Sequence, residues 1–155
     1  MVLEVNGWKL LYHPVFGDRY AQLRARAREL KASLPPREFT KHPDVELVAA
    51  VRRAILEIIP EDPNRPDFWL GADLAAFRRV KGYGLPDRYR LYYVFSSTAR
   101  TVIVLYLNDS ASLRKDAAKT DPYRVFARLV RSGSVGKDFD ANLAQWEKAR
   151  GERGK

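Results

Sequence analysis

The sequence contains no cysteine and only two histidines, and these absences exclude whole classes of chemistry. Without cysteine the chain has no disulfide, no thiolate metal ligand and no cysteine nucleophile. The two histidines, His13 and His42, argue against a multi-histidine metal centre, and we expect neither a metal nor a cofactor. A chain without disulfides fits the reducing cytoplasm, where we expect this protein to act.

Long apolar runs are also missing. Runs such as Val102–Leu107 fall far short of the roughly 20 residues that a membrane-spanning helix needs. The first residues show no secretory signal, so we expect no membrane partner. Because 46% of the 155 residues are apolar and spread along the chain, we expect a single domain over residues 1–150 and a flexible tail at 151–155.

Acidic residues are scarce in the second half of the chain. Residues 1–75 carry eleven Lys or Arg and eleven Asp or Glu, whereas residues 76–155 carry seventeen against eight. The second half therefore holds the whole net charge of +9, concentrated on predicted strands with aromatic residues between the cations, as in Arg88–Tyr93. Cations held on a sheet suit a polyanion, and RNA is the first candidate because the rings can also stack on unpaired bases.

The apolar periodicity predicts an α+β fold. An N-terminal helical hairpin is expected to pack on a small antiparallel sheet, with further helices at the C-terminal end. The predicted elements are an extended segment at 2–11, helices at 14–34 and 43–59, strands at 77–83, 88–96 and 101–108, and helices at 122–132 and 139–150. We expect the helices to cover one face of the sheet and to leave the other face free for function.

The alternation of side chains across a strand indicates where the cations point. The all-apolar set of the second strand is expected to be buried: Tyr89, Leu91, Tyr93 and Phe95. Arg88, Arg90 and Tyr92 would then face away from the core, and Arg79 and Lys81 can lie on the same face. Four cations would stand within about 10 Å. An anionic ligand explains such a cluster most simply; the alternative is an ordinary solvated face, although such faces normally mix signs.

An ordered series of short motifs runs from about residue 5 to about residue 140. In chain order they are Val5-Asn6-Gly7-Trp8, His13-Pro14-x-Phe16, Asp62-Pro63, Arg79-x-Lys81, Arg88-Tyr89-Arg90-Leu91-Tyr92-Tyr93, Val102-Ile103, Asn108-Asp109, Leu113-Arg114 and Lys119-Thr120-Asp121-x-Tyr123-x-Val125-Phe126. This series resembles the YhaV family of toxins from bacterial type II toxin–antitoxin systems, within the RelE-like superfamily. The resemblance implies a small antiparallel sheet with an N-terminal helical hairpin, in agreement with the fold expected above.

The resemblance also implies a function and partners. Its implied activity is endoribonucleolytic cleavage of mRNA, in relatives often on the ribosome, which stops translation and growth. Its implied partner is an antitoxin, for YhaV an AbrB-like protein of the PrlF type. That antitoxin itself binds operator DNA, so operator DNA is an expected partner only through the antitoxin.

Some site residues carry over by motif. Arg79 and Lys81 match the paired basic residues of one strand, Arg90 matches the arginine of the Tyr-Arg-Leu motif, and Lys119 and Tyr123 match residues near the C-terminal end of the superfamily site. Further expected RNA contacts are Arg78, Arg88, Tyr92, Arg114 and Lys115. Where YhaV-like proteins tend to have Leu-Arg-x-Tyr-Gly-Lys, residues 113–119 lack the tyrosine and the glycine, so specificity or activity could differ.

RNA carries its own nucleophile, the 2′-hydroxyl beside the scissile phosphate, so an enzyme needs no serine or cysteine. Arg90 and Arg79 are expected to clamp the phosphate, because arginine forks suit phosphate oxygens. Lys81 is the expected general base, since neighbouring cations favour its neutral form. Lys119 and Tyr123 are expected to serve the leaving oxygen or to stack on a base. Two other functions fit the same pattern: a gyrase-poisoning toxin of this fold, and a non-catalytic nucleic-acid-binding module.

Several prominent residues have simpler structural explanations. His13 and His42 precede prolines at predicted helix starts, where capping is expected, and Asp121 has the same position before Pro122. Asn108 ends a predicted strand, where turn chemistry explains it. Tyr123 lies in the first turn of a helix and could equally belong to the core.

Overall fold

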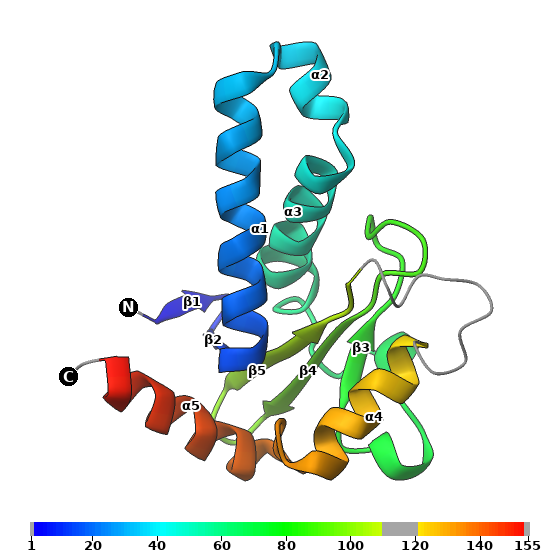
Figure 1. Cartoon of the computed structure of the whole chain (residues 1–155). Helices are drawn as coiled ribbons and strands as arrows, with labels where there is room; N and C mark the ends of the chain where they lie inside the picture. The colour runs from blue at the N-terminus through cyan, green and yellow to red at the C-terminus, as the bar shows by residue number, and fades with distance from the viewer. Residues whose placement is uncertain (1, 110–120, 154–155) are drawn as a thin grey trace.

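The central sheet has five strands, two of which come from the N-terminus (Figure 1). The computed structural model describes residues 2–109 and 121–153. Its strands are β1 (Leu3–Val5), β2 (Trp8–Tyr12), β3 (Arg78–Val80), β4 (Leu91–Ser96) and β5 (Thr101–Leu107). They lie in the order β1-β2-β5-β4-β3, and all neighbours are antiparallel except β2 and β5, which run parallel. The predicted antiparallel strands are therefore part of a larger, mixed sheet.

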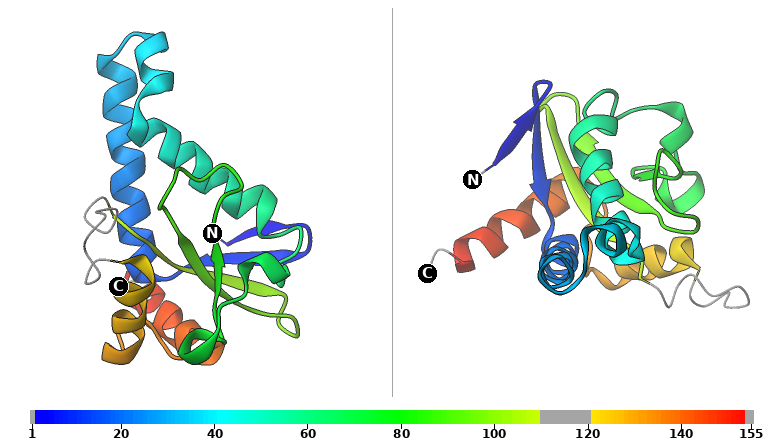
Figure 2. Two further views of the ribbon diagram at one scale, coloured as in Figure 1. Left: turned by 90° about the vertical axis from the view of Figure 1, so that its right-hand side faces the viewer. Right: turned by 90° about the horizontal axis from the view of Figure 1, so that it is seen from above.

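Three N-terminal helices rise above this sheet (Figures 1 and 2). They are α1 (Pro14–Ser33), α2 (Pro36–Lys41) and α3 (Pro43–Arg53), and α3 continues through a π-helical turn at Ala54–Ile58. α2 replaces the loop expected at the tip of the hairpin, because Pro36 can occupy the first position of a new helix. The capping role expected of His13 and His42 is confirmed: each Nδ1 accepts a hydrogen bond from the backbone N–H two residues later.

Helices cover both faces of the sheet, so the expectation that one face stays free is wrong. The first core lies between the sheet and the helical hairpin, where Leu91 and Tyr93 of β4 are buried. The second core lies on the opposite face, under α4 (Pro122–Ser132) and α5 (Phe139–Arg153), and buries Tyr92 and Val94. Alternation correctly predicted which residues of β4 share a face. The two arginines of the second set precede β4, however, and within the strand Tyr92 and Val94 are as buried as Leu91 and Tyr93, so β4 is buried on both sides.

The two C-terminal helices begin where the sequence predicts. Asp121 caps α4 by accepting hydrogen bonds from the backbone N–H groups of Tyr123 and Arg124, and Gly133 ends the helix with φ 83°. α5 continues to Arg153, three residues beyond the predicted end of that helix. Within residues 2–109 and 121–153, every helix is either too short or too polar to cross a bilayer.

Candidate nucleic-acid site

Arg79 and Arg90 lie together on the face of the sheet that α4 covers. Arg79 is in register with Tyr92, so its side chain stands on the second-core face, and Arg90 directly precedes β4. Burial lowers the pKa of Arg90, and the like charge of Arg79 lowers it further. The two guanidinium groups are therefore close enough to repel, as predicted, and an anion placed between them would relieve this repulsion.

The described acids do not neutralise this pair by direct contact. In the described part of the chain, ion pairs within 4.0 Å join Arg26 to Glu29 and Asp44, and Arg65 to Glu61. The Nε of Arg79 is buried and finds no hydrogen-bond partner among the described residues. Leaving a buried donor unpaired costs about 1–3 kcal/mol. An anionic ligand would supply the missing acceptor.

Asn108 holds the backbone of Arg90 in place. It is fully buried directly after β5, its Oδ1 accepts a hydrogen bond from the backbone N–H of Arg90 at 2.7 Å, and its Nδ2 donates to the carbonyl of Arg88 at 2.9 Å. Arg19 of α1 donates to the Asn108 carbonyl at 3.3 Å. The sequence interpretation explained Asn108 as a turn residue and missed this positioning role. The available signal was an amide side chain directly after an apolar strand of seven residues.

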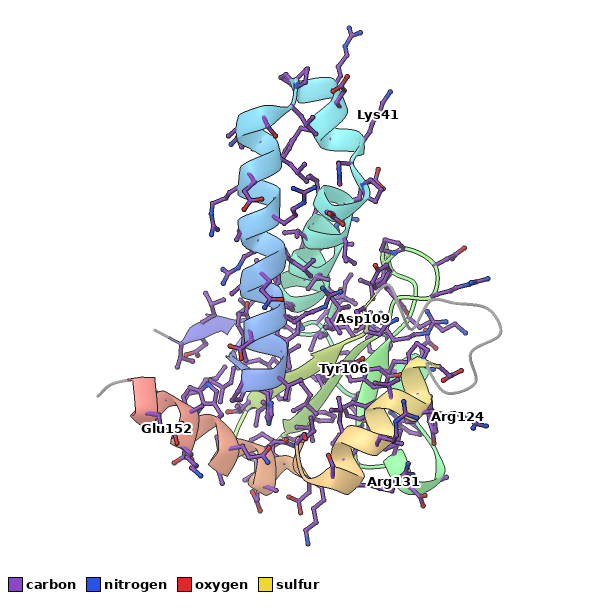
Figure 3. The ribbon with its side chains drawn as sticks, in the orientation of Figure 1. Lys41, Tyr106, Asp109, Arg124, Arg131 and Glu152 are labelled. Carbon is purple, nitrogen blue, oxygen red and sulfur yellow. The ribbon has the colours of Figure 1, made fainter. Side chains whose placement is uncertain are left out.

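Tyr92 does not face solvent, so the expectation that it does is wrong. Only 1% of the residue is exposed, and its ring stacks on Phe126 of α4 with ring centroids 4.3 Å apart. Burial raises the pKa of Tyr92 well above its usual value. Tyr106 of β5 also stacks on Phe126, and burial raises its pKa to about 12 (Figure 3). The buried ring of Tyr92 is therefore not available to stack on a base.

Arg78, the neighbour of Arg79, lies on the other face. Its guanidinium donates to the Oδ1 of Asn64 and to the carbonyls of Ala75 and Phe77, and it lies near the rings of Trp69 and Phe95. The structure therefore separates Arg78 from the Arg79 and Arg90 pair.

Lys81 and Arg88 lie on exposed loop segments and not on strands. The predicted strand 77–83 ends at Val80, and the predicted strand 88–96 begins only at Leu91. Arg88 has a φ of 71°, so strand alternation does not apply to it. The expectation that all four cations project from adjacent strands is therefore wrong: only Arg79 lies in a strand, and Arg90 directly precedes one.

The start of α4 borders the arginine pair. Asp121, its cap, is near enough to Arg90 and Tyr92 to affect the pKa of both side chains. Tyr123, in the first turn of the helix, is 38% exposed and does not belong to the core. The expected site residues Lys119, Arg114 and Lys115 lie outside the described residues. Among the described residues, no group of three or more His, Asp or Glu side chains is placed to hold a metal ion.

The fold and the site thus define a small α+β protein with a candidate anion site formed by β3, the start of β4 and the start of α4. The chain belongs to the YhaV toxin family, whose model is described as a toxin with endonuclease activity, of a toxin–antitoxin system, and matches residues 10–147. This finding confirms the resemblance that the ordered motifs indicate.

Individual relatives match over nearly the whole chain. The ribonuclease toxin YhaV of Escherichia coli K12 is 33% identical over 150 residues, which are 93% of this chain and 95% of the relative. The toxin YhaV of Escherichia coli O6:H1 is 32% identical over 152 residues, which are 94% and 96% of the two chains. No solved structure matched the chain. The protein is therefore a toxin of a toxin–antitoxin system with endonuclease activity, and such a system implies a cognate antitoxin.

Proposed function

We propose that this toxin is a metal-independent endoribonuclease that cleaves mRNA in the cytoplasm, in association with the ribosome, and thereby stops translation and growth. The observation that carries the proposal is the pair Arg79 and Arg90, which share one face while the buried Nε of Arg79 has no acceptor among the described residues. A relative that is 33% identical over 93% of the chain is named a ribonuclease toxin, which supports RNA as the substrate.

The reaction uses the nucleophile within RNA. The 2′-oxygen forms a bond to the adjacent phosphorus while the bond from phosphorus to the 5′-oxygen breaks, which leaves a cyclic phosphate and a free 5′-hydroxyl. The phosphorane between these states carries extra negative charge. In this proposal Arg79 and Arg90 stabilise this charge, since fixed cations in a partly buried site do so without reorganisation.

Two proton transfers complete the step. Lys81, exposed directly after β3, takes the proton of the 2′-hydroxyl in this proposal, and Lys119 or the exposed Tyr123 gives a proton to the leaving 5′-oxygen. Arg88, Arg114 and Lys115 contact the RNA backbone. We leave Tyr92 and Arg78 out of the RNA-binding set, because one is buried under α4 and the other is hydrogen-bonded on the opposite face.

The proposed partner is an AbrB-like antitoxin of the PrlF type. Operator DNA would be reached only through that antitoxin. Antitoxin binding is proposed to suppress RNA cleavage, so co-expression of the two proteins should restore growth.

Replacement of Arg90 by alanine tests the proposal. Removal of one such electrostatic contact typically costs a factor of about 10²–10³ in rate. We expect Arg90→Ala to lose that much mRNA cleavage, measured by mapping cut ends with and without ribosomes, while its thermal melt changes little. Arg37→Ala, which removes an exposed arginine from α2, is the matched control and should cleave normally.

Three outcomes would contradict the proposal. Full cleavage by Arg90→Ala would reject the phosphate clamp. Inhibition of DNA supercoiling without RNA cleavage would identify a gyrase poison, and RNA binding without cleavage by the unmodified protein would identify a non-catalytic module.

A further inference from the structure

The outer face of α4 carries three arginines at regular spacing. Arg124, Arg128 and Arg131 occupy positions i, i+4 and i+7 of the helix, and all three are exposed. Residues at this spacing share one face of an α-helix, so the three side chains form a stripe about 10 Å long, called here the α4 arginine stripe. Figure 3 labels Arg124 and Arg131, which come from the first and the last turn of α4.

The α4 arginine stripe points away from the sheet, because the opposite side of the helix packs on the second core. Phe126 is fully buried against the ring of Tyr92, and Leu129 and Val130 pack partly buried on the second core. α4 therefore cannot rotate without exposing this apolar face. The helix itself contains no Asp or Glu.

The stripe begins at the candidate site. Asp121 caps α4 and lies near enough to Arg90 to act on its pKa, and Tyr123 is exposed in the same first turn as Arg124. From there the arginines lead away along the outside of the molecule. A chain bound with one phosphate at Arg79 and Arg90 could therefore continue along α4.

We propose that the α4 arginine stripe binds the phosphate backbone of the single-stranded RNA substrate on one side of the scissile phosphate. This inference rests on the proposed function, and it gives α4 a role in holding substrate and not in the chemical step. Arginine suits this role because its planar fork recognises phosphate oxygens. Contacts to the backbone position a nucleic acid without reading its sequence.

An RNA strand fits the stripe better than a protein partner does. The centre of a protein interface is rich in apolar and aromatic side chains and depleted of charge. On α4 the apolar side chains turn toward the sheet, and the exposed face between the first and last turn presents arginine. A charged groove or stripe that follows the backbone is typical of proteins that bind single strands.

The salt dependence of RNA binding tests this inference directly. The probe is a short single-stranded oligoribonucleotide with 2′-O-methyl groups, which cannot be cleaved by 2′-hydroxyl attack. For single strands, each neutralised phosphate contributes about 0.7 to the slope of log Kd against log salt concentration. Replacement of all three arginines by glutamine, a good helix former, should therefore lower that slope by about 2. Cleavage should show a raised KM with kcat retained.

The chain offers a matched control. Arg24, Arg28 and Lys31 have the same spacing and are likewise exposed, but they lie on α1 in the helical hairpin. Their triple replacement by glutamine removes the same charge and should leave the slope close to its original value. The single variant Arg124→Gln, which disturbs α4 least, should lower the slope by about 0.7.

Several results would overturn the inference. An unchanged slope in the α4 variants, with cleavage still lost in Arg90→Ala, would reject the stripe and leave the proposed function standing. Equal changes in the α1 and α4 variants would show that only overall charge matters. Weakened binding of the cognate antitoxin with unchanged RNA binding would assign the stripe to a protein partner. If the unmodified protein neither binds nor cleaves RNA, the proposed function fails together with the inference.

Discussion

Arg78 and Arg79 are consecutive residues of one short strand, yet their surroundings differ completely. Arg78 has hydrogen-bond acceptors from Asn64, Ala75 and Phe77 around its guanidinium. Arg79 stands on the opposite face beside a second arginine, with its buried Nε unpaired among the described residues. The comparison shows that two arginines of one strand differ in whether their donors find acceptors; Arg19 and Arg65 also have an unpaired buried Nε, but the Arg79 side chain in addition lies beside the like charge of Arg90.

A second pair of residues repeats this contrast. Asn64 accepts hydrogen bonds from the guanidinium of Arg78 and so holds the charged group itself. Asn108 instead accepts a hydrogen bond from the backbone N–H of Arg90. The Nη1 of the Arg90 guanidinium donates to the nearby carbonyl of Tyr89. One asparagine thus fixes a side chain as part of the structure, whereas the other fixes a backbone and leaves the side chain directed to the site.

The largest effect is expected from separate removal of the two neighbouring arginines. Arg79→Ala should reduce RNA cleavage by a factor of about 10²–10³, because it removes half of the proposed phosphate clamp. Arg78→Ala should leave the cleavage rate per folded molecule within a few-fold and lower the free energy of unfolding by about 1–2 kcal/mol, since its acceptors lose charged donors. Cleavage kinetics and denaturant melts measure both quantities. Equal losses of cleavage in the two variants would break the comparison.

An intermediate effect is expected from the two asparagines. Asn108→Ala should lower the free energy of unfolding by about 2–3 kcal/mol, because it leaves the buried N–H of Arg90 and the carbonyl of Arg88 unpaired. It should also slow cleavage, since Arg90 is no longer held. Asn64→Ala, at an exposed position, should cost less stability and leave cleavage unchanged. If Asn108→Ala cleaved RNA at the original rate per folded molecule, Asn108 would not be a positioning residue.

The smallest effect is expected from a change of pH, which acts on stability through His13 and not through Arg78 or Arg79. Burial lowers the pKa of His13, whose Nδ1 caps α1 and whose Nε2 lies 2.6 Å from the Oε1 of Gln145 in α5. The unfolded chain therefore binds a proton more readily than the folded one. Protonation of His13 therefore favours the unfolded chain. The stability of the fold with neutral His13 is fully present above the unfolded pKa of about 6.5, and it is lost as the pH falls below that value toward the lower folded pKa.

Melting temperatures between pH 7.5 and 5 measure this effect. His13→Asn keeps a capping side chain but does not titrate, so its melting temperature should fall less on acidification than that of the unmodified protein. His42→Asn makes the same replacement at the cap of α3 and serves as the matched control for the loss of a capping histidine. Identical pH profiles for His13→Asn and the unmodified protein would contradict the assignment.

Local signals in the sequence predicted the helices well. Pro14, Pro43 and Pro122 each follow a capping side chain and each begins a helix, and Gly133 ends one. These signals act within a few residues, because a cap needs only its own side chain and the next backbone N–H groups. The sequence also predicted the close pair of Arg79 and Arg90, since strand pairing carries short-range alternation into space.

Local signals could not show that helices cover both faces of the sheet. Whether Tyr92 meets water or Phe126 depends on where residues 34 positions apart come together, and no local pattern specifies this. The parallel pairing of β2 with β5 is of the same kind, because it joins the two ends of a long crossover that includes the helical hairpin.

The order of amino acids alone determined the charge asymmetry, the ends of the helices and the family motifs, because each depends only on residue type and short spacing. Tertiary packing decided which cations have acceptors and which do not. It placed Arg78 against Asn64 and Asn108 behind Arg90, since hydrogen bonds between distant segments form only where the whole fold brings donor and acceptor within about 3 Å.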